Sequence, residues 1–141
     1  MIAVDTNILV YAHRAELAQH RRARTRLTRL AEGAARWSIP VFCLGEFLRI
    51  VTHPRVFDPP STIAEACLAL QRILQSPSLH VLMPGERFWR LLIEAMEEAD
   101  AAGNLVFDAQ IAALCREAGT SALLTEDRDF DRFHGLVTMR L

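Results

Sequence analysis

Four carboxylic acids lie within or just after apolar segments, where an ionised side chain is energetically unfavourable unless a partner stabilises it. Asp5 directly follows the apolar opening MIAV, and Asp127 lies two residues beyond the apolar segment SALLT. Glu46 and Asp108 interrupt the apolar segments CLGEFLRI and LVFDAQIAALC. Transfer of an ionised carboxylate into apolar surroundings is costly unless the carboxylate is paired or binds a metal ion. The four acids together therefore indicate a site that binds cations.

Taken singly, each acid has a simpler explanation. Asp5 could be a helix N-cap, Glu46 could pair with Arg49, and Asp127 could belong to a solvated acidic loop. Asp108 could lie at the boundary between an apolar face and solvent. The joint pattern favours chemistry, because four carboxylates brought together repel one another and need divalent cations to remain ionised. Oxygen ligands, without His or Cys at ligand spacing, favour Mg²⁺ or Mn²⁺ over zinc.

The elements that must position these acids alternate between short apolar strands and amphipathic helices. Because such alternation is typical of parallel sheets covered by helices, we expect an α/β fold. It would be a three-layer α/β/α arrangement with a short, mainly parallel central sheet, formed by one domain over residues 1–141. The strands are expected at 1–4, 36–39, 79–83, 121–125 and 136–139, and the helices at 20–35, 41–52, 61–75, 86–102 and 105–118.

The expected helix boundaries rest on capping residues. Ser61, with Glu65 nearby, is expected to open one helix, whereas Gly103 and Gly119 are expected to close two others. Ligands of parallel sheets gather at the carboxyl ends of the strands. Asp5 and Asp127 both follow strands, so the same edge of the sheet should carry both.

Lysine is absent from the chain, and all 16 basic residues are arginine, against 17 acidic residues. This absence excludes Schiff-base lysines, the lysine of a phosphate-binding P-loop and Ser–Lys hydrolases. The formal net charge of −1 also conceals an asymmetry. Residues 1–85 carry ten Arg and six acids, and residues 86–141 carry six Arg and eleven acids, so the two parts differ in sign.

The arginines concentrate in one predicted helix, whose candidate contact residues are Arg21, Arg22, Arg24, Arg26 and Arg29. Such a face could bind the phosphates of a nucleic acid or the carboxylates of an acidic protein segment, and it could equally be a solvated helix surface.

The cellular location is expected to be the cytoplasm. Three cysteines without metal-binding or CxxC spacing indicate buried thiols in a reducing compartment. No apolar stretch approaches the length of a membrane span, and Asp5 follows the opening apolar residues too closely for a signal peptide.

Four segments in order resemble one family over nearly the whole chain. VDTNIL at 4–9, the isolated Glu46, FDAQIAAL at 107–114 and TEDRDF at 125–130 are together similar to the PIN-domain ribonucleases, in particular the VapC toxins of bacterial toxin–antitoxin pairs. The resemblance implies a PIN-like fold and a Mg²⁺-dependent endoribonuclease in which Mn²⁺ can substitute. It also implies a homodimer held inactive by a VapB-like antitoxin. No association with membranes is expected, because no apolar stretch approaches the length of a membrane span.

The resemblance also implies roles for individual residues. The catalytic and metal-binding acids would be Asp5, Glu46, Asp108 and Asp127. The residues that orient them would be Thr6, Asn7 and Thr125. For the fourth acid, Glu126, Asp127, Asp129 and Asp131 are all candidates; the T-x-D spacing selects Asp127, with Asp129 in reserve. The arginine run would then contact either RNA or the antitoxin.

Two other functions remain open at this level. One is a phosphatase of the haloacid dehalogenase type, in which an Asp after the first strand is the nucleophile. That family has a second Asp two residues further on, where this chain has Asn7. The other is a binding module without catalysis, in which the acids are structural.

Overall fold

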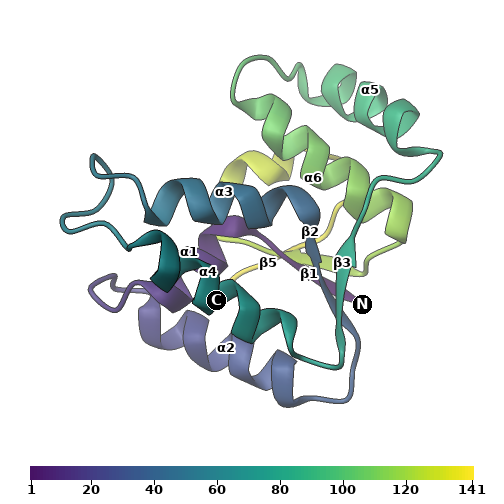
Figure 1. Ribbon diagram of the computed structural model, residues 1–141. Helices are drawn as coiled ribbons and strands as arrows, with labels where there is room; N and C mark the ends of the chain where they lie inside the picture. Colours follow the sequence, from purple (N-terminus) through teal and green to yellow (C-terminus); the bar gives the residue numbers. More distant parts are fainter.

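Five short parallel strands form the centre of the computed structural model, which describes residues 1–141 (Figure 1). Their order across the sheet is β3-β2-β1-β4-β5. The strands are β1 (Ile2–Val4), β2 (Trp37–Pro40), β3 (Leu79–Leu82), β4 (Ala122–Leu124) and β5 (Thr138–Met139). The expected parallel sheet is confirmed, and every adjacent pair of strands in it is parallel.

Helices cover both faces of this sheet, which confirms the three-layer α/β/α class. In Figure 1, α3, α5 and α6 lie above the strands, and α2 and α4 lie below them. The helices are α1 (Thr6–His13), α2 (His20–Glu32), α3 (Val41–Val51), α4 (Ile63–Leu74), α5 (Phe88–Ala99) and α6 (Leu105–Ala118), followed by the 3-10 helix η1 (Arg128–Arg132). None of the helices has the length and apolar character that a membrane span requires.

The register of the central strands brings two of the predicted acidic segments together. Val4 is paired with Leu124, and the amide of Asp5 donates a hydrogen bond of 3.0 Å to the carbonyl of Leu124. Because β1 and β4 are parallel neighbours, the residues that follow them emerge at the same edge of the sheet. Asp5 and Thr125 therefore lie side by side although 120 positions separate them.

One cluster of 27 buried residues holds the layers together. It includes Phe47 of α3 and Ile111 of α6, which are 0% and 2% exposed. Each lies within three residues of a predicted site acid, Glu46 or Asp108. The apolar positions that fix α3 and α6 against the core therefore also fix the direction of these two carboxylates.

Two of the expected helix boundaries were wrong. Thr62, rather than Ser61, caps α4: its hydroxyl accepts from the amide of Glu65, whose carboxylate accepts from the amide of Thr62. Helix α5 ends earlier than expected, at Ala99, because Asp100 rather than Gly103 is its left-handed C-cap (φ 47°). The prediction for Gly119 is confirmed, since it ends α6 at φ 61°.

Candidate active site

Asp5 is the most deeply buried acid of the candidate site, with 4% of its surface exposed. It follows β1 and is the N-cap of α1, where its Oδ1 accepts a hydrogen bond of 2.7 Å from the amide of Thr6. Its Oδ2 accepts from Asn7 Nδ2 at 2.7 Å and from Thr125 Oγ1 at 2.6 Å. The capping explanation considered for Asp5 is therefore correct, and three donors also fix the direction of its carboxylate.

Thr125 connects the two acidic segments. Besides donating to Asp5, its hydroxyl oxygen accepts from Asn7 Nδ2 and from the amide of Asp127, each at 3.0 Å. The side-chain oxygen of Asn7 in turn accepts from the amide of Glu126 at 3.3 Å. Short hydroxyl and amide side chains thus bind the end of β1 to the loop after β4, and these contacts are compatible with the orienting role predicted for Asn7 and Thr125.

Glu46 reaches the site from α3 through Thr6. The hydroxyl of Thr6 donates a hydrogen bond of 2.6 Å to Glu46 Oε2, and Arg49 lies 3.7 Å from the other carboxylate oxygen. The side chain of Glu46 is 30% exposed. Glu46 therefore combines both explanations given to it, because it pairs loosely with Arg49 and is also fixed beside Asp5 through Thr6.

The strongest clustering of carboxylates involves Asp108, Asp127 and Asp129. One oxygen from each lies within 4.8 Å of the others. Asp127 caps η1 by accepting from the amide of Asp129 at 2.8 Å, and this turn directs both carboxylates towards Asp108 of α6. Asp5 and Glu46 are not in this group of three. The structure thus brings Asp127 and the reserve Asp129 to Asp108 together rather than selecting one of them.

The electrostatics of the site disfavour ionisation of two of its acids, Asp5 and Asp108. Burial, together with the charges of Glu46 and Asp127, raises the pKa of Asp5 to about 7, although bonds from Thr125 and Thr6 act in the opposite direction. Burial followed by repulsion from Asp127 and Asp5 likewise raises the pKa of Asp108 to about 7. Mutual repulsion of this kind is what a divalent cation relieves.

The residues present fit a hard divalent cation. Three carboxylates offer oxygens at mutual distances that one ion can bridge, and the buried Asp5 adds its charge to the same region. The cluster contains only oxygen donors, which suits Mg²⁺ or Mn²⁺ better than zinc. The three clustered side chains, Asp108, Asp127 and Asp129, are all carboxylates that could hold one metal ion.

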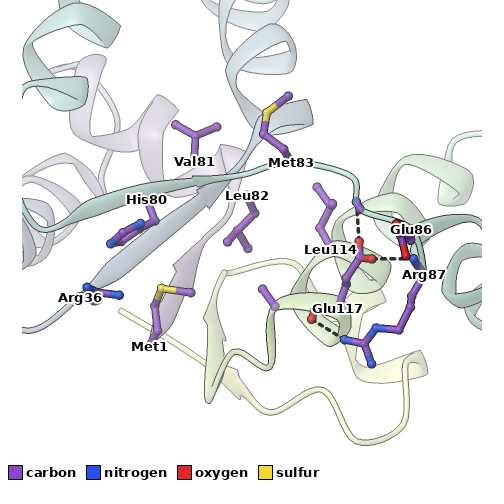
Figure 2. Close-up of a pocket in the computed structure, with 12 residues that line it drawn as sticks. Met1, Arg36, His80, Val81, Leu82, Met83, Glu86, Arg87, Leu114 and Glu117 are labelled. Carbon is purple, nitrogen blue, oxygen red and sulfur yellow. Dashed lines mark hydrogen bonds between the residues drawn. The ribbon is translucent and has the colours of Figure 1, made fainter.

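A different cavity, of about 610 Å³, lies at the exposed edge of β3 and contains none of these acids (Figure 2). Its two carboxylic acids are Glu86 and Glu117. The Glu117 carboxylate accepts from the amides of Gly85 and Arg87, both at 2.8 Å, and so fixes the segment between β3 and α5. Glu117 thus has a structural role, and this cavity does not mark the chemistry.

The match to known families agrees with the geometry. The family described as PIN domain matches residues 2–136. The chain belongs to the PIN-domain family. Ribonuclease VapC43 of Mycobacterium tuberculosis is 40% identical over 136 residues, which are 96% of the chain and 92% of that relative. Ribonuclease VapC31 of the same species is 35% identical over 133 residues, or 94% of the chain and 93% of the relative.

Solved structures share the PIN fold at lower sequence identity. A structure of VapC20 from Mycobacterium tuberculosis, described as a toxin that cleaves the sarcin–ricin loop, superimposes with a TM-score of 0.73. It is 21% identical, and the match covers 100% of both chains. VapBC2 from Rickettsia felis, bound to a promoter DNA fragment, gives a TM-score of 0.72 at 21% identity, covering 99% of this chain and 98% of that one.

Sequence reasoning missed Tyr11 as a neighbour of this PIN-domain site. Burial and the charges of Glu126, Asp127 and Asp5 raise the pKa of its phenol. Tyr11 is four positions beyond Asn7 on α1 and therefore shares its helix face. The four-residue spacing of Asn7 and Tyr11 could have indicated this, but only if residues 6–13 had been predicted to form a helix.

Replacing Thr125 by valine should weaken the site more than its size suggests. The change keeps the shape but leaves Asp5, Asn7 and the amide of Asp127 without their shared partner. We expect divalent-ion affinity and RNA cleavage to fall about 10–100-fold. Calorimetric Mn²⁺ titration and a cleavage assay measure the two effects.

The matched control for this variant is Thr52→Val, which removes a hydroxyl bonded to the carbonyl of Leu48, outside the acidic network. Thr52→Val should retain the metal affinity of the unaltered protein. Equal affinities in Thr125→Val and Thr52→Val would show that Thr125 does not orient the acids.

Proposed function

We propose that this protein is a Mg²⁺-dependent endoribonuclease and the toxin of a type II toxin–antitoxin pair, with Mn²⁺ able to replace Mg²⁺. The observation that carries the proposal is the cluster of Asp108, Asp127 and Asp129 beside the buried Asp5. Ribonuclease relatives that are 35–40% identical over nearly the full chain support RNA as the substrate. The expected partners are RNA, a VapB-like antitoxin and a second copy of the chain.

Some side chains of the site would bind the ion, and others would orient the carboxylates. Asp108, Asp127 and Asp129 would bind the ion, while Asp5 would add a carboxylate held in place by its three hydrogen bonds. When bound, the ion would supply an activated water and neutralise charge on the scissile phosphate. Thr6 would keep Glu46 directed towards the attacked phosphodiester.

A phosphatase that uses Asp5 as nucleophile fits the geometry poorly. Both carboxylate oxygens of Asp5 accept hydrogen bonds, and only 4% of the residue is exposed, so a phosphorus atom has little access. Asn7, which occupies the position of the second acid, donates to Asp5 instead of acting as a proton donor to a leaving group. A purely structural role for the acids is also a poor fit, because burial and repulsion raise two of their pKa values to about 7.

A cleavage assay tests the proposed activity. Purified protein is incubated with structured cellular RNAs in Mg²⁺, in Mn²⁺ or in chelator, and the cut ends are mapped. We expect cleavage with either ion and none in chelator, leaving 5′-phosphate and 3′-hydroxyl ends. Cleavage that persists in chelator, or that leaves 2′,3′-cyclic phosphates, would contradict a metal-activated water.

The arginine face of α2 is proposed to bind RNA phosphates next to this site. A groove of about 450 Å³ is lined by Arg21, Arg22, Arg26 and Arg29 and continues to Arg140. Arg140 in turn contacts the acidic loop, which comprises residues 125–131. Arg21, Arg24 and Arg29 also line a neighbouring groove of about 480 Å³. This continuity with the acidic loop favours RNA over an antitoxin as the partner of the face.

Charge removal on this face should weaken RNA binding in a salt-dependent manner. In the double variant Arg21→Ala/Arg29→Ala, we expect the slope of log Kd against log salt to fall by about 0.7 for each lost phosphate contact. A fluorescence titration with uncleavable RNA at several salt concentrations measures the slope.

The control double variant is Arg36→Ala/Arg55→Ala, which removes two exposed arginines elsewhere and should leave the slope unchanged. If Arg21→Ala/Arg29→Ala binds RNA normally but loses affinity for the antitoxin, the face serves the antitoxin. If neither partner is affected, the face is only a solvated surface.

A further inference from the structure

Arg140 lies beyond the motifs that identify the family, yet its side chain contacts the acidic loop at three points. Its Nη1 donates to the carbonyls of Thr125 and Asp127, both at 2.9 Å. Its Nη2 donates to Asp131 Oδ1 at 3.0 Å. The guanidinium therefore spans the loop from its first residue to the 3-10 helix η1.

The sheet places Arg140 in this position. Met139 of β5 is paired with Leu124 of β4, and the amide of Thr125 donates to the carbonyl of Met139 at 2.9 Å. The next residue after β5 thus emerges beside the start of the acidic loop, at the same edge of the sheet as Asp5. Only an arginine has enough donors in a fixed planar fork to reach two carbonyls and a carboxylate together.

Further contacts hold the segment that carries Arg140. The amide of Leu141 donates to Glu126 Oε1 at 2.6 Å, and the guanidinium of Arg22 on α2 donates to the carbonyl of Leu141. Arg140 is thus held on one side by β5 and on the other by a contact that reaches the arginine face. Its side chain is 35% exposed, which is compatible with a fixed position.

The acidic loop needs such support because four of its six residues from Glu126 to Asp131 carry carboxylates. Repulsion among them and with Asp108 opposes the arrangement that brings Asp127 and Asp129 to α6. The hydrogen bonds from the Arg140 side chain fix the carbonyls on either side of Glu126, and its guanidinium adds a positive charge next to the acids.

We propose that Arg140 is a positioning residue that holds the loop 125–131 in the conformation in which Asp127 and Asp129 bind the divalent ion. The inference rests on the proposed metal-dependent function. A residue that positions ligands should affect metal affinity and kcat. A residue that only binds RNA phosphates should affect KM and the salt dependence of RNA binding.

The test compares Mn²⁺ affinity, measured by calorimetry, with kcat and KM for RNA cleavage in three variants. For Arg140→Ala we expect about 10-fold weaker Mn²⁺ binding and a similar loss of kcat, with KM changed less. Arg140→Lys should recover part of both losses, because an ammonium can still reach some of the three acceptors. Arg128→Ala removes an exposed arginine of the same loop and should change neither quantity.

Three results would overturn the inference: normal Mn²⁺ affinity in Arg140→Ala, equal losses in Arg128→Ala, or no recovery in Arg140→Lys. If Arg140→Ala does not fold, Arg140→Lys and Arg140→Gln give the same comparison with smaller changes. Failure of the unaltered protein to bind Mn²⁺ would instead refute the proposed function, so the two failures can be distinguished.

Discussion

Replacing Asp108 by asparagine is expected to lower RNA cleavage by about 10³-fold, because in the proposed function Asp108 binds the ion and its loss removes several kcal/mol of charge stabilisation from the transition state. The same change should raise the Tm of the metal-free protein at neutral or higher pH. The reason is that burial and repulsion raise the pKa of Asp108 to about 7, so its ionised form is disfavoured in the fold. Opposite effects on activity and stability are the mark of a ligand cluster.

The control for this variant is Asp100→Asn, at the exposed left-handed residue that ends α5. It removes the same charge and can adopt the same conformation, since asparagine tolerates positive φ. Asp100→Asn should retain full activity. Addition of Mg²⁺ should raise the Tm of the unaltered protein and of Asp100→Asn, but raise that of Asp108→Asn much less. Full cleavage activity in Asp108→Asn would remove this residue from the site.

The stability of the metal-free protein is expected to fall as pH rises, which is the opposite of the effect of a carboxylate held in a salt bridge. Asp5 and Asp108 have pKa values of about 7 in the fold, against a usual value of 3.8. Between these values the folded state binds more protons than the unfolded state, so stability falls as pH rises towards 7 and recovers as pH is lowered. The Tm of the metal-free protein should therefore be higher at about pH 5.5 than at about pH 8.

His13 contributes in the opposite direction within this range, because burial and the charge of Arg14 lower its pKa. The quantity to measure is therefore the difference in Tm between the unaltered protein and Asp108→Asn at each pH. This difference should shrink as pH falls below 7. A difference that is independent of pH would show that Asp108 ionises normally in the fold.

The rate of RNA cleavage should depend on the ionisation of the same two acids, Asp5 and Asp108, but it should rise with pH where the stability of the metal-free protein falls. Protons compete with the ion for the carboxylates. At limiting Mg²⁺, two acids with pKa values of about 7 lose about 100-fold of their doubly ionised form between pH 8 and pH 6. Cleavage should fall accordingly, and saturating Mg²⁺ should move the fall to lower pH. A rate that stays constant over this range at limiting Mg²⁺ would contradict the proton competition.

Much of the fold could be predicted because its strands are short apolar segments between clear stops. Asp5 and Asp127 were expected at one edge of the sheet, and the parallel register of β1 and β4 brings the segments that carry them together at that edge. Helix α1 was not predicted, because its eight residues are too few to show a helical period against an apolar strand. Tyr11 was missed with it.

Other parts of the site depend on contacts that no local pattern encodes. Asp129 reaches Asp108 through the turn capped by Asp127, and a one-residue difference in that turn would exclude it. Arg140 reaches the loop only through the pairing of β5 with β4. Spacing in the sequence could identify the acidic loop but could not say which of its carboxylates would face α6.

Anomalous X-ray scattering from crystals soaked in Mn²⁺ would locate the divalent ion in the acidic cluster itself. We expect an ion bound by oxygens of Asp108, Asp127 and Asp129, close to Asp5, and its loss in Asp108→Asn crystals. An ion bound elsewhere, or no ion at a Mn²⁺ concentration that supports full cleavage, would show that these carboxylates do not form the metal site of the nuclease.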